Sequence, residues 1–124
     1  MVKIQIIMEV MMTNKKHYKP LLVESVKVVV DVEQQRFIGF DGNYCQANKK
    51  ALGVCDVSTE KEQFAPIAML GILLIEAGGT ITAGDLIASD SEGRAITTTD
   101  IATANGYSID SATAGQTIRI VRGI

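Results

Sequence analysis

The chain has few of the side chains from which catalytic and metal sites are usually built. Its 124 residues include one His, two Cys, no Trp, three Phe and three Tyr. Most general bases and metal ligands are His, Cys or grouped carboxylates, so this scarcity argues against an enzyme or a metalloprotein. The formal net charge of −2 argues against a nucleic-acid partner, which would select a basic surface. We therefore expect no catalytic residues, no cofactor, no metal and no nucleic-acid partner.

Glycine is missing from the start of the chain, because all eleven glycines lie at position 39 or later. Residues 1–22 are basic, with four Lys against one Glu, whereas residues 76–124 hold six acidic and three basic side chains. The polar segment 13–20 ends in Pro20, which disfavours helix in the residues before it. We expect an extended N-terminal arm over residues 1–22 and a single β domain over residues 23–124. A solvated tail stays open as the alternative for the arm.

β-Branched side chains are abundant, since Val, Ile and Thr make up 36 of the 124 residues. Such side chains favour the pleated, half-buried surface of a sheet. Short apolar runs bounded by glycine or polar residues predict an all-β fold, either a small β-barrel or a β-sandwich built of short strands and hairpins. The expected strands and apolar runs cover residues 23–32, 36–40, 51–57, 64–69, 72–77, 107–109 and 116–122.

The most regular stretch is residues 80–96, where two apolar segments flank the turn Asp90-Ser91-Glu92-Gly93. Gly93 stands where a turn commonly needs a left-handed backbone. The hydroxyl and carboxylate groups beside it are explained by turn chemistry, because no His lies nearby in the sequence. The hairpin also resembles the lipoyl carrier pattern, but no lysine follows Lys61, so there is no amine to modify.

Cys45 and Cys55 are too far apart in sequence for a zinc-ligand pair or a redox C-x-x-C motif. We expect neutral, structural thiols, although a disulfide across a hairpin is geometrically possible. The apolar start of the chain is interrupted by Gln5 and Glu9, is too short for a membrane span and has no signal-peptide cleavage pattern. We expect a soluble protein with no membrane partner.

A series of short motifs, in order and at characteristic spacing, resembles the phage capsid decoration or head cement proteins. Residues 36–124 carry this resemblance. The motifs are Ala51-Leu52-Gly53-Val54, Ile75-Glu76-Ala77-Gly78-Gly79, Ala83-Gly84-Asp85, Ala88-Ser89-Asp90, Gly93-Arg94-Ala95, Asn105-Gly106-Tyr107 and the stretch 112–121.

The resemblance implies a virion structural protein that binds the outer surface of the phage head and stabilises the capsid lattice. It implies the major capsid protein as partner, a homotrimer as the oligomer, and synthesis in the bacterial host cytoplasm before assembly on the virion. Extended arms can add a strand to a partner's sheet, and residues 2–7 and 21–32 are the candidates for this. The expected capsid or subunit contacts are Lys15, Lys16, His17, Tyr18, Lys19 and Pro20.

A second hypothesis is a trimeric, β-clip-like enzyme that acts on a small molecule at a site shared between subunits. Its site would recruit charged side chains from neighbouring chains. The candidates are Asp85, Asp90, Arg94 and Arg119.

Overall fold

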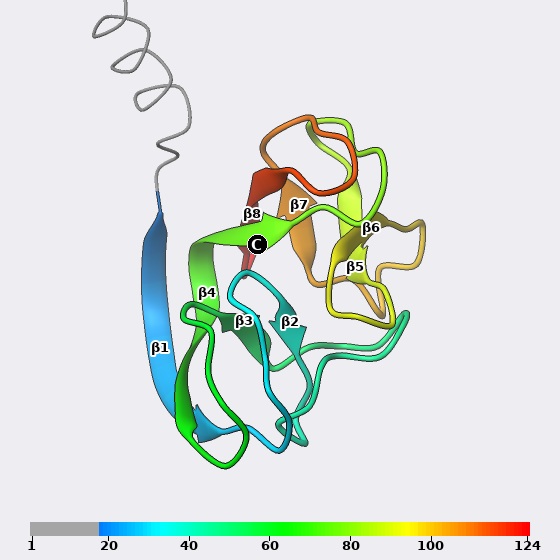
Figure 1. Ribbon diagram of the computed structural model, residues 1–124. Coiled ribbons are helices and arrows are strands. Elements are labelled where there is room, and N and C mark those ends of the chain that lie inside the picture. The colour runs from blue at the N-terminus through cyan, green and yellow to red at the C-terminus, as the bar shows by residue number, and fades with distance from the viewer. Residues whose placement is uncertain (1–17) are drawn as a thin grey trace, which may run out of the picture.

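The structure, a computed structural model, describes residues 18–124, and these residues form strands, turns and loops without a helix. Figure 1 shows the long strand β1 at one side of the molecule and the short hairpins at the other. The all-β class expected from the composition is confirmed. The strands are β1 (Lys19–Lys27), β2 (Phe37–Ile38), β3 (Gly53–Cys55), β4 (Phe64–Glu76), β5 (Leu86–Ser89), β6 (Ala95–Thr97), β7 (Gly106–Ser108) and β8 (Thr117–Arg122).

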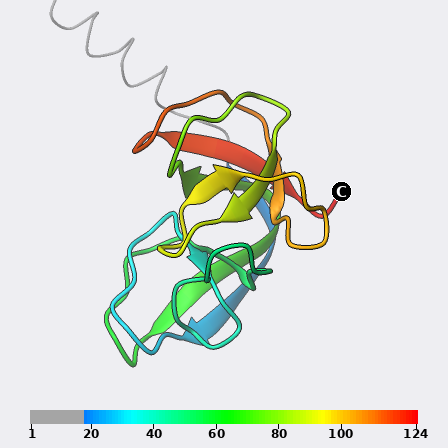
Figure 2. The same cartoon turned by 90° about the vertical axis from the view of Figure 1, so that its right-hand side faces the viewer.

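All eight strands belong to one antiparallel sheet with the order β2-β3-β4-β8-β7-β5-β6, and β1 is added to β4. The sheet curls until its ends meet, where the Phe37 amide donates to the Gly93 carbonyl at 2.6 Å. A parallel bridge between Ala77 and Ala95 joins the end of β4 to β6. The domain is therefore a nearly closed barrel, as Figure 2 shows from the side of the hairpins.

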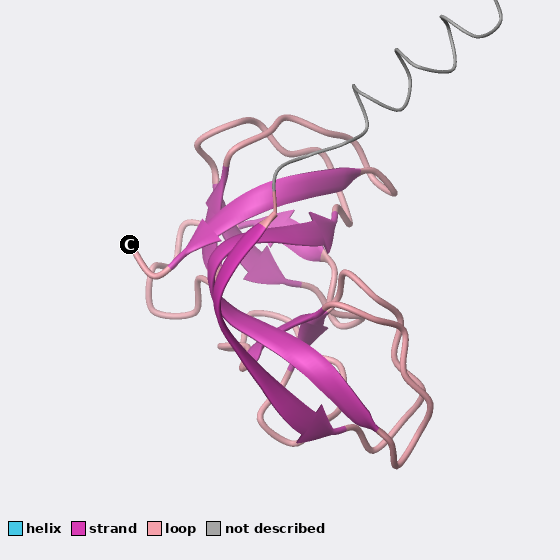
Figure 3. Ribbon diagram, turned by 90° about the vertical axis from the view of Figure 1, so that its left-hand side faces the viewer, coloured by secondary structure: helices cyan, strands magenta, loops and turns pink. Residues whose placement is uncertain are grey.

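Strand β4 is the longest in the sheet and the one that organises it. One of its edges pairs with β1 from Phe64 to Ile72, and the other pairs first with β3 and then with β8. Figure 3 shows β1 and β4 running alongside each other. The sequence predicted two strands, 64–69 and 72–77, and this prediction is wrong because β4 runs without a break through Gly71.

Gly71 continues the strand because it lets another backbone come very close. Its φ of +110° lies in a region that L side chains rarely adopt. A Cβ at this position would overlap the Lys19 carbonyl oxygen and lie 2.9 Å from the Leu21 nitrogen. Glycine is thus required at this position by the close contact between β4 and β1. The sequence pattern instead predicted a break between two strands at Gly71.

The strand expected at residues 23–32 is displaced toward the N-terminus. It begins at Lys19 and ends at Lys27, so Lys19–Leu22, assigned above to the arm, are part of β1. After Lys27 the chain turns into the barrel, where Val28 is buried and its amide donates to the Gln63 carbonyl at 3.0 Å. The β-branched run after Val28 therefore packs as a loop against the core.

Two clusters of buried side chains form the core. The larger includes Phe37, Leu73, Ile75 and Ile118, and the smaller includes Val28, Ile38 and Ile67. Successive residues of β2, Phe37 and Ile38, belong to different clusters, because neighbouring side chains of a strand point to opposite faces. Both faces of the short strands are therefore covered, which explains their nearly continuous apolar sequence.

The two cysteines are free and buried, as expected for structural thiols. Cys45 belongs to the larger core cluster and Cys55 to the smaller. Burial raises the pKa of both thiols above the ordinary value, so both stay neutral at physiological pH. They contribute to the core as small apolar side chains.

The hairpins at the C-terminal side of the chain follow the predicted turn chemistry. One Asp90 carboxylate oxygen accepts hydrogen bonds from the amides of Glu92 and Arg94, each at 2.8 Å. Gly93 adopts a φ of +74°, as its position in the turn demands. The strands predicted at residues 107–109 and 116–122 correspond to β7 and β8, which pair with each other.

Replacing Gly71 by alanine should loosen β1 from β4. We expect Gly71→Ala to lower the free energy of unfolding by about 2–4 kcal/mol, because it adds backbone strain and a clash with β1. Gly84→Ala is the control, since Gly84 has a similar φ of +92° but a Cβ added there would meet no atom within 4 Å. Urea unfolding of both variants measures the difference, and equal losses would contradict a close contact at Gly71.

Candidate functional site

Strand β1 is the most accessible element of the barrel, and none of its nine residues is buried. Leu21, Leu22 and Val23 expose 81%, 46% and 44% of their surface. Among residues 18–124, β1 pairs with β4 alone, so its outer edge carries no strand. The backbone groups along such an edge are a ready template for another strand. The outer edge of β1 is therefore the first candidate for a binding surface.

The first half of β1 has two features that limit its pairing with other strands. Pro20 has no amide hydrogen to donate. The register with β4 shifts on both sides of Leu22, which marks a bulge at this part of the strand. Prolines and bulges are common at sheet edges that must not aggregate. The regular part of the free edge is consequently Val23–Lys27, where the register with β4 is continuous.

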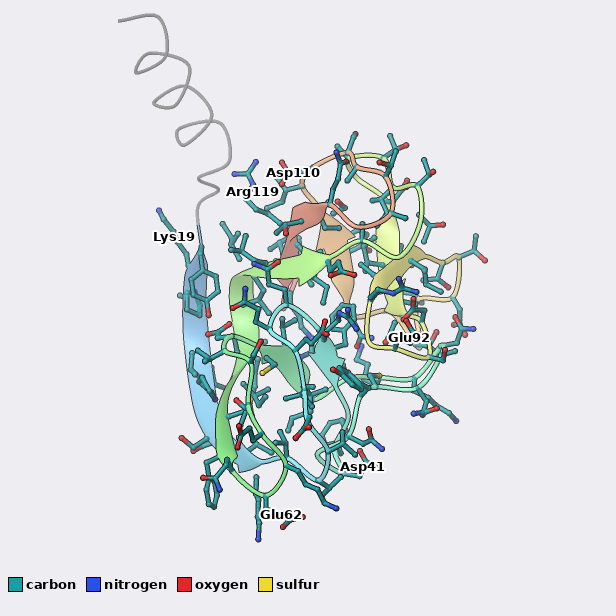
Figure 4. All side chains as sticks on the ribbon, in the orientation of Figure 1. Lys19, Asp41, Glu62, Glu92, Asp110 and Arg119 are labelled. Atoms are coloured by element: carbon teal, nitrogen blue, oxygen red, sulfur yellow. The ribbon has the colours of Figure 1, made fainter. Side chains whose placement is uncertain are left out.

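The residues predicted as contacts fall into two groups. Lys15, Lys16 and His17 lie outside the described residues, as does the segment 2–7. Tyr18, Lys19 and Pro20 lie at the start of β1, where Lys19 is opposite Ile72 and Pro20 is opposite Gly71. Figure 4 labels Lys19 at this end of β1. The structure thus brings three of the six predicted residues to the edge strand.

Tyr18 fastens the start of β1 to the loop that follows β3. Its hydroxyl donates a hydrogen bond to the Asp56 carboxylate. Burial raises the pKa of Tyr18, and the hydrogen bond and the negative charge of Asp56 raise it further. Burial also raises the pKa of Asp56, against the opposing effect of the hydrogen bond from Tyr18. The phenol therefore stays protonated and remains a donor at neutral pH.

An open groove with a volume of about 440 Å³ lies beside β1 and the end of β8. Its walls are mostly apolar and include Leu22 and Leu70, with Ile101 exposing 71% of its surface. Lys50 and Arg122 are the charged side chains in the lining, which contains no Asp or Glu. We did not predict this groove, because its residues come from segments scattered along the chain and share no local pattern.

The charged residues proposed for an enzyme make hydrogen bonds that build turns. Asp85 accepts from the Thr82 amide at 2.8 Å, and Arg94 bonds Asp90 within the β5–β6 turn. Arg119 lies beside Asp110, as Figure 4 shows, and donates two hydrogen bonds to its carboxylate. Within residues 18–124, no hydrogen bond or ion pair links these three groups with one another. Each has a structural role in its own hairpin.

The part of the chain that the structure describes holds no group of three or more His, Cys, Asp or Glu side chains placed to bind a metal ion. It also holds no helix with the length and apolar character needed to cross a membrane.

These features define a small β-barrel with an open strand edge and an open, mostly apolar groove beside it. The family model of phage cement proteins matches residues 22–124, and the chain belongs to this family. The resemblance noted in the sequence is confirmed. No curated protein matches the sequence.

A solved structure supports the barrel fold independently. The N base of the head fiber gp8.5 of bacteriophage phi29 superposes with a TM-score of 0.72 at 21% sequence identity. The match covers 82% of this chain and 93% of that one. At this identity the comparison establishes a shared fold.

Removing the Tyr18 hydroxyl should weaken the attachment of β1. We expect Tyr18→Phe to lower the free energy of unfolding by about 1 kcal/mol at pH 7, since one hydrogen bond to a partly exposed carboxylate is lost. The folded-state pKa of Tyr18 lies above its unfolded value of 10.0. The hydrogen bond therefore contributes fully below pH 10 and its contribution is lost as the pH rises through the folded-state pKa.

Unfolding in urea at pH 7, 9 and 11 tests this expectation. The difference between wild type and Tyr18→Phe should shrink at the highest pH. Tyr107→Phe is the control, because the Tyr107 hydroxyl makes no hydrogen bond within residues 18–124. A Tyr18→Phe protein as stable as wild type at pH 7 would show that this contact does not hold β1.

Proposed function

We propose that this chain is a capsid decoration protein that binds the outer surface of an assembled phage head and stabilises its lattice without catalysing a reaction. Membership of the phage cement family supports a virion structural role. The observation that carries the finer proposal is the open edge of β1, which offers backbone hydrogen bonds and exposed apolar side chains along one side of a rigid barrel.

Strand addition would explain how so small a protein attaches to a shallow surface. An extended segment of the major capsid protein could pair with Val23–Lys27, gaining main-chain hydrogen bonds without a deep pocket. A homotrimer at a local three-fold position would present three such edges at once. Simultaneous attachment at three points raises the overall affinity far above that of one edge, and it ties neighbouring capsid subunits together.

The enzyme alternative has less support from the described residues. Its candidates, namely Asp85, the Asp90–Arg94 pair and Arg119, make their hydrogen bonds at three separate places in the fold. A decoration role needs none of them as catalysts, and their hydrogen bonds stabilise the loops that keep the barrel rigid.

The direct test adds the purified protein to expanded capsids that lack it, from the phage that encodes this chain. Differential scanning calorimetry should show capsid melting at a higher temperature, and sedimentation should show protein bound to the particles. The proposal also predicts a trimer by light scattering. Failure of saturating protein to bind or to stabilise the capsids would overturn it.

Lysine on the free edge of β1 should impair attachment and leave the fold intact. We expect the double variant Leu21→Lys, Val23→Lys to bind capsids at least tenfold more weakly, because charged edge residues oppose strand addition and these side chains are already exposed. Its melting temperature in isolation should stay close to that of wild type.

The charge-matched control is Ala114→Lys together with Thr113→Lys, in the exposed turn between β7 and β8. This control should bind like wild type. Binding of the β1 variant within twofold of the control, measured by cosedimentation, would place the attachment surface elsewhere.

A further inference from the structure

Arg122 differs from the other three arginines of the chain in its partners. Arg36 pairs with Glu33 and Glu76, Arg94 with Asp90 and Glu92, and Arg119 with Asp110. Arg122 has no carboxylate partner within residues 18–124, and it donates only to main-chain carbonyls. Its positive charge is therefore held in place by dipoles and is not neutralised by an acidic side chain.

The carbonyls fix the Arg122 guanidinium at one position in the groove. Nη1 donates to the carbonyls of Leu52 at 2.7 Å and Met69 at 3.2 Å, and Nη2 donates to that of Ala51. These bonds account for three of the five N–H donors. Nε makes no hydrogen bond within residues 18–124, and it shares with Nη2 the edge of the guanidinium that commonly binds a carboxylate through two bonds. The group is thus positioned before any partner arrives.

The surroundings of Arg122 would strengthen such a pair. Arg122 is half-buried, and this partial removal from water lowers the pKa of its guanidinium. A carboxylate that entered would be screened less by solvent than at an open surface. Lys50 adds a second positive charge to the lining, although its ammonium already donates to the Ala104 carbonyl at 2.7 Å. The side chains of the groove therefore favour an anionic group, since none of them is acidic, and Ile124, the last residue of the sequence, also lines it.

The rest of the groove offers apolar contact. Leu22, Leu70 and Ile101 are large side chains exposed by 46%, 41% and 71%, and all three line the groove. Arginine is one of the residues that often dominate interface energies, and covering the exposed apolar walls would remove their surface from water. A free ion would use the charge and leave these walls uncovered, whereas a peptide segment would use both.

We propose that this groove binds an apolar segment of the major capsid protein whose Asp or Glu carboxylate pairs with Arg122. This inference rests on the proposed function. The capsid protein is favoured as the occupant because Leu22, which lines the groove, belongs to β1, the strand whose outer edge is the proposed site of strand addition. One extended segment could then pair with β1 and place its following residues in the groove.

The test measures binding of the full-length protein to undecorated capsids of the phage that encodes it. Ile101→Asp puts a negative charge at the exposed rim of the groove. There it would pair with the positive charges of Arg122 or Lys50 and repel the incoming carboxylate. We expect its affinity for capsids to fall at least tenfold. Thr99→Asp is the matched control, because it adds the same charge to the same loop at an exposed position outside the groove, and it should bind within twofold of wild type.

Arg122→Gln and Arg122→Lys test the carboxylate itself, with thermal unfolding to confirm that each variant folds. Both variants should bind capsids more weakly than wild type. Raising the salt concentration should weaken capsid binding less in Arg122→Gln than in wild type, because the glutamine carries no charge to be screened. If Arg122→Gln does not fold, Ile101→Asp and Thr99→Asp still decide the matter.

Two results would overturn the inference and leave the proposed function standing. One is equal capsid binding by Ile101→Asp and Thr99→Asp. The other is a change in oligomeric mass of Ile101→Asp by light scattering with unchanged capsid affinity, which would make the groove an interface between copies of this chain. Absence of capsid binding by the wild-type protein would instead refute the proposed function.

Discussion

Three strands meet at Gly71, and the rest of the molecule depends on this close contact. Gly71 is paired with Pro20 of β1 on one edge of β4 and with Arg122 of β8 on the other. The absence of a side chain allows the backbone of β1 to approach the strand. The same crossing places Leu22, Leu70 and Arg122 around one groove. The contact at Gly71 thus holds β1, whose outer edge is open, beside the groove.

The barrel is held together by its buried core and by the hydrogen bonds that nearly close its sheet. Its buried clusters cover both faces of the short strands, and hydrogen bonds between the β2 end and the β5–β6 turn nearly close the sheet. Closure removes strand edges that would otherwise aggregate. β1 is the exception, since it lies outside the strand order β2-β3-β4-β8-β7-β5-β6 that forms the barrel and exposes apolar side chains. One open edge on a rigid body leaves backbone groups available for pairing with another strand.

The parts of the structure that follow from local chemistry could be predicted from the sequence. The abundance of β-branched residues predicted the all-β class, and the spacing of Asp90 and Gly93 predicted their turn. Contacts between distant segments could not be predicted. The sequence pattern predicted a strand end at Gly71 because the residues of β1 that approach it lie far away in the sequence. The buried side chain of Asn105 likewise accepts a hydrogen bond from the distant Ala51 amide and donates one to the Lys49 carbonyl.

The candidate site was predicted only in part for the same reason. Tyr18, Lys19 and Pro20 stand in one basic segment, and their charge and position in the sequence drew attention to them. Lys19 and Pro20 are the first residues of the exposed strand, and Tyr18 directly precedes it. The groove gathers Leu22, Lys50, Ile101 and Arg122 from four regions of the chain. The register of β1 and β8 against β4 brings Leu22 and Arg122 together, and the loops that hold Lys50 and Ile101 complete the lining. A single sequence contains each residue but not that register.

The central claim is that β1 stays paired with β4 and offers its outer edge to the capsid. Hydrogen–deuterium exchange of the protein, free and bound to capsids, tests it most directly because amide exchange reports hydrogen bonding residue by residue. We predict that amides within Val23–Lys27 gain protection on binding while those of β4 stay protected in both states. Unchanged exchange throughout β1, with new protection on a distant face of the barrel, would contradict it.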